Sequence, residues 1–152
     1  MIDFTSRLPL VQSMSPGNVA DIVGGRIILN RAPPNLPVSG FAADKGYDSE
    51  DFMMDIKKKW RHVAVAIPVR NMRQTGDPTR NRAAKRKDRS YDGSLYKKRT
   101  EIKRYFSRKK QVFNLGEEKT RHLKNFRANC YLTSIMEILE WLSKHPHPQV
   151  AV

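Results

Sequence analysis

The sequence predicts an α/β fold in one domain, spanning residues 1–152. Stretches typical of strands alternate with stretches typical of helices up to Val69, in the order strand, helix, strand, helix, strand. A basic loop at about 70–93 and two further helices follow. The chain has 152 residues, 39% of them hydrophobic, which suits one domain with a core and excludes a disordered basic tail.

The first five elements follow from apolar spacing and turn residues. A first strand is expected at 8–14, before the turn residues 15–17. A helix over 19–29, capped by Asn18, comes next, and then a strand at 38–43. The second helix begins after a cap at Asp48 or Ser49 and ends near Trp60, with acidic residues in its early turns and lysines in its last turn.

The remaining elements differ in character. Residues 62–69 alternate between apolar and other side chains, which predicts a third strand. Helical spacing predicts a helix over about 94–113 and another over about 120–143. The last helix is apolar nearly all round after Asn129, so we expect it to be buried in the core or against a partner.

Positive charge is concentrated in one stretch of the chain. Lys and Arg number 29 against 15 Asp and Glu, a net charge of +14. Between Lys57 and Lys110 there are 20 basic residues and four acidic ones, so the rest of the chain is close to neutral. Counterion release makes such a stretch favourable for phosphate binding, which predicts a nucleic-acid partner.

Several classes of protein are not expected. Cys130 is the single cysteine, so no internal disulfide forms, and no window holds the roughly 18 apolar residues that cross a bilayer. The first residues do not resemble a secretory signal. We therefore expect no membrane partner and a location in the cytoplasm.

Two groups of residues are candidates for chemistry. Asp44 ends the strand at 38–43, where ligands bind in open α/β sheets, and its carboxylate could hold a divalent metal ion. A turn or cap role for Asp44 remains the alternative. At about 100° per residue, a polar stripe on the helix from 94 lies beside a predicted buried stripe of Leu95, Ile102, Phe106 and Phe113. The polar stripe contains Tyr96, Arg99, Lys103 and Lys110, which could reach phosphates or form a solvated face.

These motifs resemble those of a known family. The segment ADKGYDS, followed by Tyr96-x2-Arg99-x3-Lys103-x6-Lys110, is similar to the second half of the catalytic domain of DDE insertion-sequence transposases with the YREK signature. PLVQSMSPGNVAD resembles the strand and turn before the second Asp of that family, and the similarity runs from about residue 3 to 143. The resemblance implies an RNase-H-like fold, with a mixed sheet flanked by helices, and DNA transposition by Mg²⁺-dependent cleavage and strand transfer.

The resemblance also implies roles for individual residues. Asp44 matches the second catalytic, metal-binding Asp, while Tyr96, Arg99 and Lys110 match residues that contact transposon-end phosphates. Lys103 stands at the position of the catalytic Glu and repels a metal ion. The family's first Asp is expected before the start of this chain, which would make it an N-terminally truncated domain. We therefore expect DNA binding through these positions, Lys103 and Arg86 of the basic loop, without complete catalysis.

The expected partners are the transposon ends, together with a second copy of the chain or the missing N-terminal half. The setting is a prokaryotic cell, near the nucleoid. Two alternatives remain at this point. One is a non-catalytic basic nucleic-acid-binding protein, for which Tyr96, Arg99 and Lys110 matter no more than the basic loop. The other is a remnant that does not fold alone.

Overall fold

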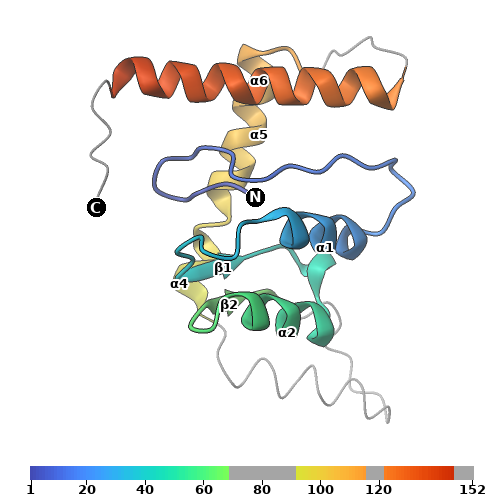
Figure 1. Ribbon diagram of the computed structural model, residues 1–152, viewed down its shortest axis with the longest axis vertical. Helices are drawn as coiled ribbons and strands as arrows, with labels where there is room; N and C mark the ends of the chain where they lie inside the picture. The colour runs from blue at the N-terminus through green and yellow to red at the C-terminus, as the bar shows by residue number, and fades with distance from the viewer. Residues whose placement is uncertain (69–91, 116–121, 146–152) are drawn as a thin grey trace. The chain divides into compact units, whose positions relative to one another are not determined.

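A computed structural model describes residues 1–68, 92–115 and 122–145 (Figure 1). The chain divides into two compact units. The first, called here the sheet unit, comprises Gly17–Thr100. The second, the helical unit, comprises Met1–Pro16 and Glu101–Val152. Most of the predicted basic loop, including Arg86, and the C-terminal tail lie outside the described residues.

The sheet unit contains a small parallel sheet with helices. Its order is α1 (Asp21–Arg31), β1 (Gly40–Ala42), the 3₁₀ helix η1 (Lys45–Tyr47), α2 (Glu50–Lys59), β2 (Ala64–Ala66) and α4 (Gly93–Lys97). β1 and β2 pair in parallel, with Gly40 opposite Ala64, Phe41 opposite Val65 and Ala42 opposite Ala66. Parallel neighbours need a crossover connection, which η1 and α2 supply. The predicted α/β class is therefore confirmed for this unit.

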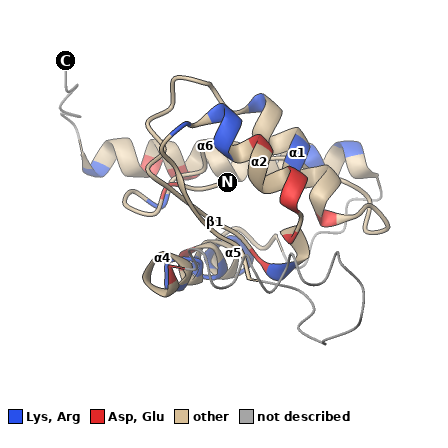
Figure 2. Cartoon of the chain, turned by 90° about the horizontal axis from the view of Figure 1, so that it is seen from below, with Lys and Arg blue, Asp and Glu red and all other residues tan. Residues whose placement is uncertain are grey.

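Helix α2 shows how local sequence sets its ends. Ser49 caps the helix, because its hydroxyl oxygen accepts a hydrogen bond from the amide of Phe52. Acidic residues occupy the first turn and Lys57, Lys58 and Lys59 the last turn, which complements the helix dipole (Figure 2). The Trp60 amide closes the helix by donating to the Ile56 carbonyl. Of the two caps predicted, Ser49 is the one used.

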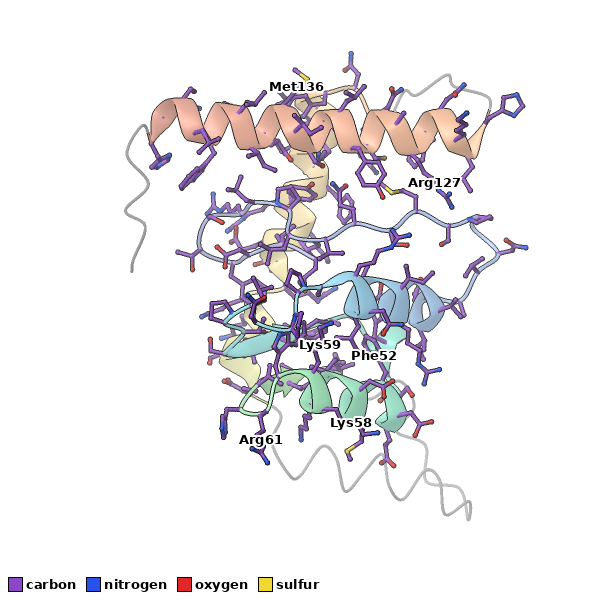
Figure 3. The ribbon with its side chains drawn as sticks, viewed as in Figure 1. Phe52, Lys58, Lys59, Arg61, Arg127 and Met136 are labelled. Carbon is purple, nitrogen blue, oxygen red and sulfur yellow. The ribbon has the colours of Figure 1, made fainter. Side chains whose placement is uncertain are left out.

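The core of the sheet unit is built around α2. Phe52 and Ile56 are 1% and 0% exposed, and the rings of Phe52 and Trp60 both pack against Phe41 of β1. Figure 3 shows Phe52 and Lys59 on the side of α2 that faces α1, with Lys58 and Arg61 on the other side. The Lys59 ammonium donates to the Leu29 carbonyl of α1 at 2.6 Å, so its apolar stem is covered while its charge is satisfied.

Three predicted boundaries in the sheet unit change. Helix α1 begins at Asp21 after Ala20, which makes no side-chain cap, so the predicted cap at Asn18 is wrong. The strand predicted at 38–43 is shorter, at Gly40–Ala42. The strand predicted at 62–69 is formed over Ala64–Ala66. Burial increases along this short strand, from the exposed Ala64 to the fully buried Ala66, and Val63 and Ile67 just outside it are buried as well.

The helical unit is formed by α5 (Thr100–Val112), α6 (Leu123–Lys144) and the first 16 residues. Helices α5 and α6 cross at a steep angle (Figure 1). The strand predicted at 8–14 is wrong: the segment forms one isolated antiparallel bridge, between Pro9 and Ile2. Proline has no amide hydrogen to donate to a strand ladder, and beyond it the amides of Leu10 and Val11 both donate to the Met1 carbonyl, so no regular ladder forms.

The helix predicted over 94–113 is broken into α4 and α5. Asp92 starts α4 by accepting hydrogen bonds from the amides of Ser94 and Leu95. A turn then follows, in which the Lys98 amide donates to the Leu95 carbonyl and the Arg99 amide to the Tyr96 carbonyl. The helical ladder is therefore interrupted before Thr100. Tyr96 and Arg99 therefore lie outside the helix that carries Lys103 and Lys110, whereas the sequence predicted one helix for all four residues.

The buried face of α5 also differs from the prediction. Leu95 of α4 is buried as expected, but Phe106 is 53% exposed. Tyr105 and Lys109 are the residues of α5 that are buried, at 8% and 2% exposed. They lie four positions apart and so share one face of the helix. Partners on α6 select this face, as described below.

Helix α6 buries a polar face and exposes an apolar one. Its buried residues are Cys130, Thr133, Ser134 and Glu137. Its exposed residues include Leu132, Ile135, Met136 and Leu139, each more than half exposed (Met136 is labelled in Figure 3). Within this chain the apolar side is not covered, because hydrogen-bonding partners decide which side faces α5, so burial of that side against a partner stays a prediction. Among the described residues, no helix is long and apolar enough to span a bilayer.

Candidate functional site

Asp44 lies two residues beyond the end of β1, at the start of η1. Its Oδ1 accepts a hydrogen bond from the Lys45 amide at 2.6 Å, so the residue caps the 3₁₀ helix. Its side chain is 52% exposed. The structure thus places the carboxylate beyond the strand end, as predicted, and also gives it the cap role that the sequence left open.

The turn after Asp44 is packed closely against α1. A Cβ at Gly46 would come within 2.5 Å of the Asp21 carboxylate, and one at Gly25 within 2.8 Å of the Tyr47 ring. Burial, followed by the negative charges of Asp21 and Asp44, raises the pKa of Tyr47. Two carboxylates therefore act on this turn. Sequence reasoning did not select Asp21, although it ends the segment PLVQSMSPGNVAD that carries the resemblance.

Arg99 joins the end of α4 to Asp44. Its Nη1 donates to Asp44 Oδ2 at 2.7 Å, across 55 positions of sequence. The guanidinium also lies over the Tyr96 ring, 5.1 Å from its centre, and the side chain is only 20% exposed. Three residues singled out from the sequence, Asp44, Tyr96 and Arg99, are therefore brought together within the sheet unit.

Close packing of α4 on β1 makes this meeting possible. A Cβ at Gly40 would lie 2.8 Å from the end of the Leu95 side chain, so a larger residue at this position would force that side chain to shift. Leu95 is 7% exposed and precedes Tyr96 directly. Glycine at position 40 thus lets the short helix approach the sheet, and the approach delivers Arg99 to the strand end.

The basic residues of α5 fall into two groups. Lys103 and Lys110 are exposed, and neither forms an ion pair with any residue in the described ranges. Arg104 instead pairs with Glu101, and Arg108 pairs with Glu140. The free charge of this helix is therefore concentrated at Lys103 and Lys110, which lie seven positions, about two turns, apart on one face.

Glu101, the acidic residue of α5, is engaged in ion pairs. Its side chain is 14% exposed and pairs with Arg104 and, at 2.8 Å, with Arg7. Two arginines thus already neutralise its carboxylate within the helical unit. On a regular helix Glu101 and Lys103 point in nearly opposite directions, so these ion pairs leave Lys103 unaffected.

Lys109 forms a buried polar network that the sequence did not reveal. Its ammonium donates to Thr133 Oγ1 at 2.9 Å and to Ser134 Oγ at 2.7 Å, and lies 3.0 Å from Glu137 Oε2. Burial lowers the pKa of Lys109, and the Glu137 carboxylate opposes this shift. Burial also disfavours the charged form of Tyr105, which for a phenol raises the pKa. In the sequence Lys109 is one of many lysines in the basic stretch. The only signal that could have predicted its burial is its position four residues after Tyr105.

A divalent metal ion does not fit the residues described. No group of three or more His, Cys, Asp or Glu side chains in the described ranges could hold one. The Asp44 carboxylate accepts a hydrogen bond from the Arg99 guanidinium through Oδ2. The positive charge of Arg99 opposes a cation at the same carboxylate. No chemical step is therefore assigned to Mg²⁺ in this chain.

Comparison with known proteins places the chain in a family. A family model described as the transposase DDE domain matches residues 1–138. The chain belongs to the transposase DDE domain family. No curated protein and no solved structure matches it. Membership links this chain to transposition.

Proposed function

We propose that this DDE-family chain binds DNA in transposition and is itself catalytically incomplete. The match to the transposase DDE domain over residues 1–138 carries the proposal. The net charge of +14, with 20 basic residues between Lys57 and Lys110, supports a phosphate-rich partner. Its relatives would be the Mg²⁺-dependent enzymes that cleave DNA and transfer strands.

The finer family assignment is also a proposal. Tyr96, Arg99 and Lys110 stand at the spacing of the YREK signature, which favours that subtype and an RNase-H-like fold. The parallel pairing of β1 and β2 across α2 is compatible with part of such a sheet. Both units would then belong to one domain of the catalytic type.

The proposed DNA-contact residues are Tyr96, Arg99, Lys103, Lys110 and Arg86. Tyr96 holds the guanidinium of Arg99 against its ring, which keeps a bidentate phosphate donor in a defined position. Lys103 and Lys110 offer exposed charges without an acidic partner in the described part of the chain. Arg86 belongs to the basic loop, outside the described residues.

Catalytic incompleteness rests on two features. Lys103 occupies the position at which the YREK signature has its metal-binding Glu, and Asp44 is paired with Arg99. Partners would be transposon-end DNA and either a second copy of the chain or a polypeptide that carries the remaining carboxylates. The setting would be the cytoplasm of a prokaryotic cell, in association with the nucleoid.

We predict no Mg²⁺-dependent nicking of supercoiled DNA by the purified chain, because a lysine cannot replace a carboxylate as a metal ligand. The measurement compares conversion to open-circle DNA with and without Mg²⁺, for the wild type and for Asp44→Ala. Both proteins should match the protein-free control. Nicking that requires Mg²⁺ and disappears in Asp44→Ala would show that the chain is a competent nuclease.

We predict that Arg99→Ala and Arg86→Ala affect DNA binding differently. The probes are the terminal duplexes of the element that encodes the chain and an unrelated duplex of equal length. Arg99→Ala should weaken binding to the terminal duplexes several-fold more than to the unrelated one. Arg86→Ala should weaken both alike and lower the slope of log K against log salt by about one.

The same experiment tests the second candidate function. In a basic nucleic-acid-binding protein without a catalytic ancestry, both arginines would act as interchangeable charges. Equal losses on both duplexes would therefore favour that function and count against a transposon-end interface. The break between α4 and α5 is the observation that favours this candidate, because Arg99 is not part of the helix that carries Lys103 and Lys110.

A further inference from the structure

Both oxygens of the Asp44 carboxylate are engaged in the free chain. Oδ1 accepts from the Lys45 amide at 2.6 Å and Oδ2 accepts from Arg99 Nη1 at 2.7 Å. A DNA phosphate offers a guanidinium the same kind of partner, namely two anionic oxygens in one plane with the donor. The carboxylate and a phosphate therefore compete for the same face of Arg99.

We propose that Asp44 is an internal competitor of DNA, which holds Arg99 until a phosphate replaces it. The inference rests on the proposed DNA binding and adds a regulation of that site. It also gives Asp44 a role that does not require a metal ion. This matters because the described residues offer no group that could hold one. In the free chain Arg99 binds the Asp44 carboxylate, and in the complex with DNA it binds a phosphate instead.

The geometry allows this exchange with little rearrangement. Asp44 is 52% exposed, so water can solvate its Oδ2 once Arg99 leaves. The Lys45 amide keeps Oδ1 in place during the exchange. Arg99 stays against the Tyr96 ring, and its low exposure of 20% limits the positions open to it. Exposed ion pairs are weak, so a phosphate within a multiply charged DNA surface can displace this one.

The test is a double-mutant cycle with Asp44→Asn and Arg99→Ala. Asparagine is chosen because its Oδ1 can still accept the Lys45 hydrogen bond and cap η1. Binding to a fluorescein-labelled DNA duplex is measured by anisotropy in EDTA over a salt series. Asp44→Asn should bind about two- to fivefold more tightly than wild type, the range typical of an exposed ion pair. In the Arg99→Ala background the same substitution should change the affinity little.

Asp55→Asn is the matched control for the added positive charge. Asp55 also lies in the sheet unit and pairs with an arginine, Arg26, at 3.6 Å. Its substitution should give a smaller gain, which persists when Arg99 is absent. Circular dichroism melting of each variant shows whether the fold is kept.

The outcomes separate this inference from the proposed function. Wild type that binds duplex DNA, with a gain in Asp44→Asn that depends on Arg99, supports both. DNA binding with no gain beyond that of Asp55→Asn, or with a gain that survives Arg99→Ala, overturns the competition and leaves DNA binding intact. Wild type that binds no duplex DNA overturns the proposed function and the inference together.

Discussion

Replacing Lys109 by Met is expected to lower the free energy of unfolding by about 3–5 kcal/mol. Lys109 is 2% exposed and Glu137 is 7% exposed, so the substitution leaves a carboxylate buried without its ammonium partner. Arg108 stands 4.0 Å from Glu137 Oε1 and compensates only at long range. The hydroxyl groups of Thr133 and Ser134 also lose the donor that they share.

The measurement is urea unfolding followed by circular dichroism. Lys110→Met is the matched control, because the same change is made one residue further along α5 at an exposed position. Its effect should stay within about 0.5 kcal/mol. Lys109→Met combined with Glu137→Leu should recover most of the loss, since buried ion pairs are often replaceable by apolar pairs. Equal effects of Lys109→Met and Lys110→Met would contradict the buried network.

Replacing Lys103 and Lys110 together by Gln is expected to weaken DNA binding roughly 50-fold near 0.1 M salt. Each lysine that contacts a phosphate releases about 0.9 counterions, so the slope of log K against log salt should fall by about two. Neither lysine has an ion-pair partner in the described ranges, so their full charges are available to DNA. Anisotropy titrations over a salt series measure both quantities.

Arg104→Gln is the control for this prediction. Arg104 lies on the same helix, but it pairs with Glu101, so less of its charge is available to a phosphate. Its substitution should change the salt slope by well under one. If Arg104→Gln lowered the salt slope by about one, as expected for the loss of one lysine, all basic residues of α5 would contribute alike. That result would contradict the distinction between paired and free charges.

Local signals in the sequence predicted the sheet unit well. Ser49 as a cap and the charges at the two ends of α2 act within a few residues, so they operate in any tertiary setting. The two strands flanking α2 were found for the same reason, although both are shorter than predicted. Asp44 was placed correctly, just beyond the end of β1.

The prediction of the buried face of α5 was wrong, because that face is chosen by contacts with another helix. Apolar periodicity assigned Phe106 to the core, whereas Tyr105 and Lys109 are buried. Periodicity considers only the polarity of each side chain. The facing side of α6 carries Thr133 and Ser134, which accept hydrogen bonds from Lys109, and Glu137, which balances its charge, so a buried lysine is favoured there over an apolar residue. For the same reason the apolar Leu132 and Leu139 remain exposed.

The sequence by itself determined the family, the charge distribution and the lysine at position 103, because these are properties of residue order alone. Only the tertiary structure decided which charges are free. It pairs Arg99 with Asp44 and buries Lys109 against Glu137, while Lys103 and Lys110 stay exposed. The energy of a charge depends on its distance from other charges and from water, and folding sets both.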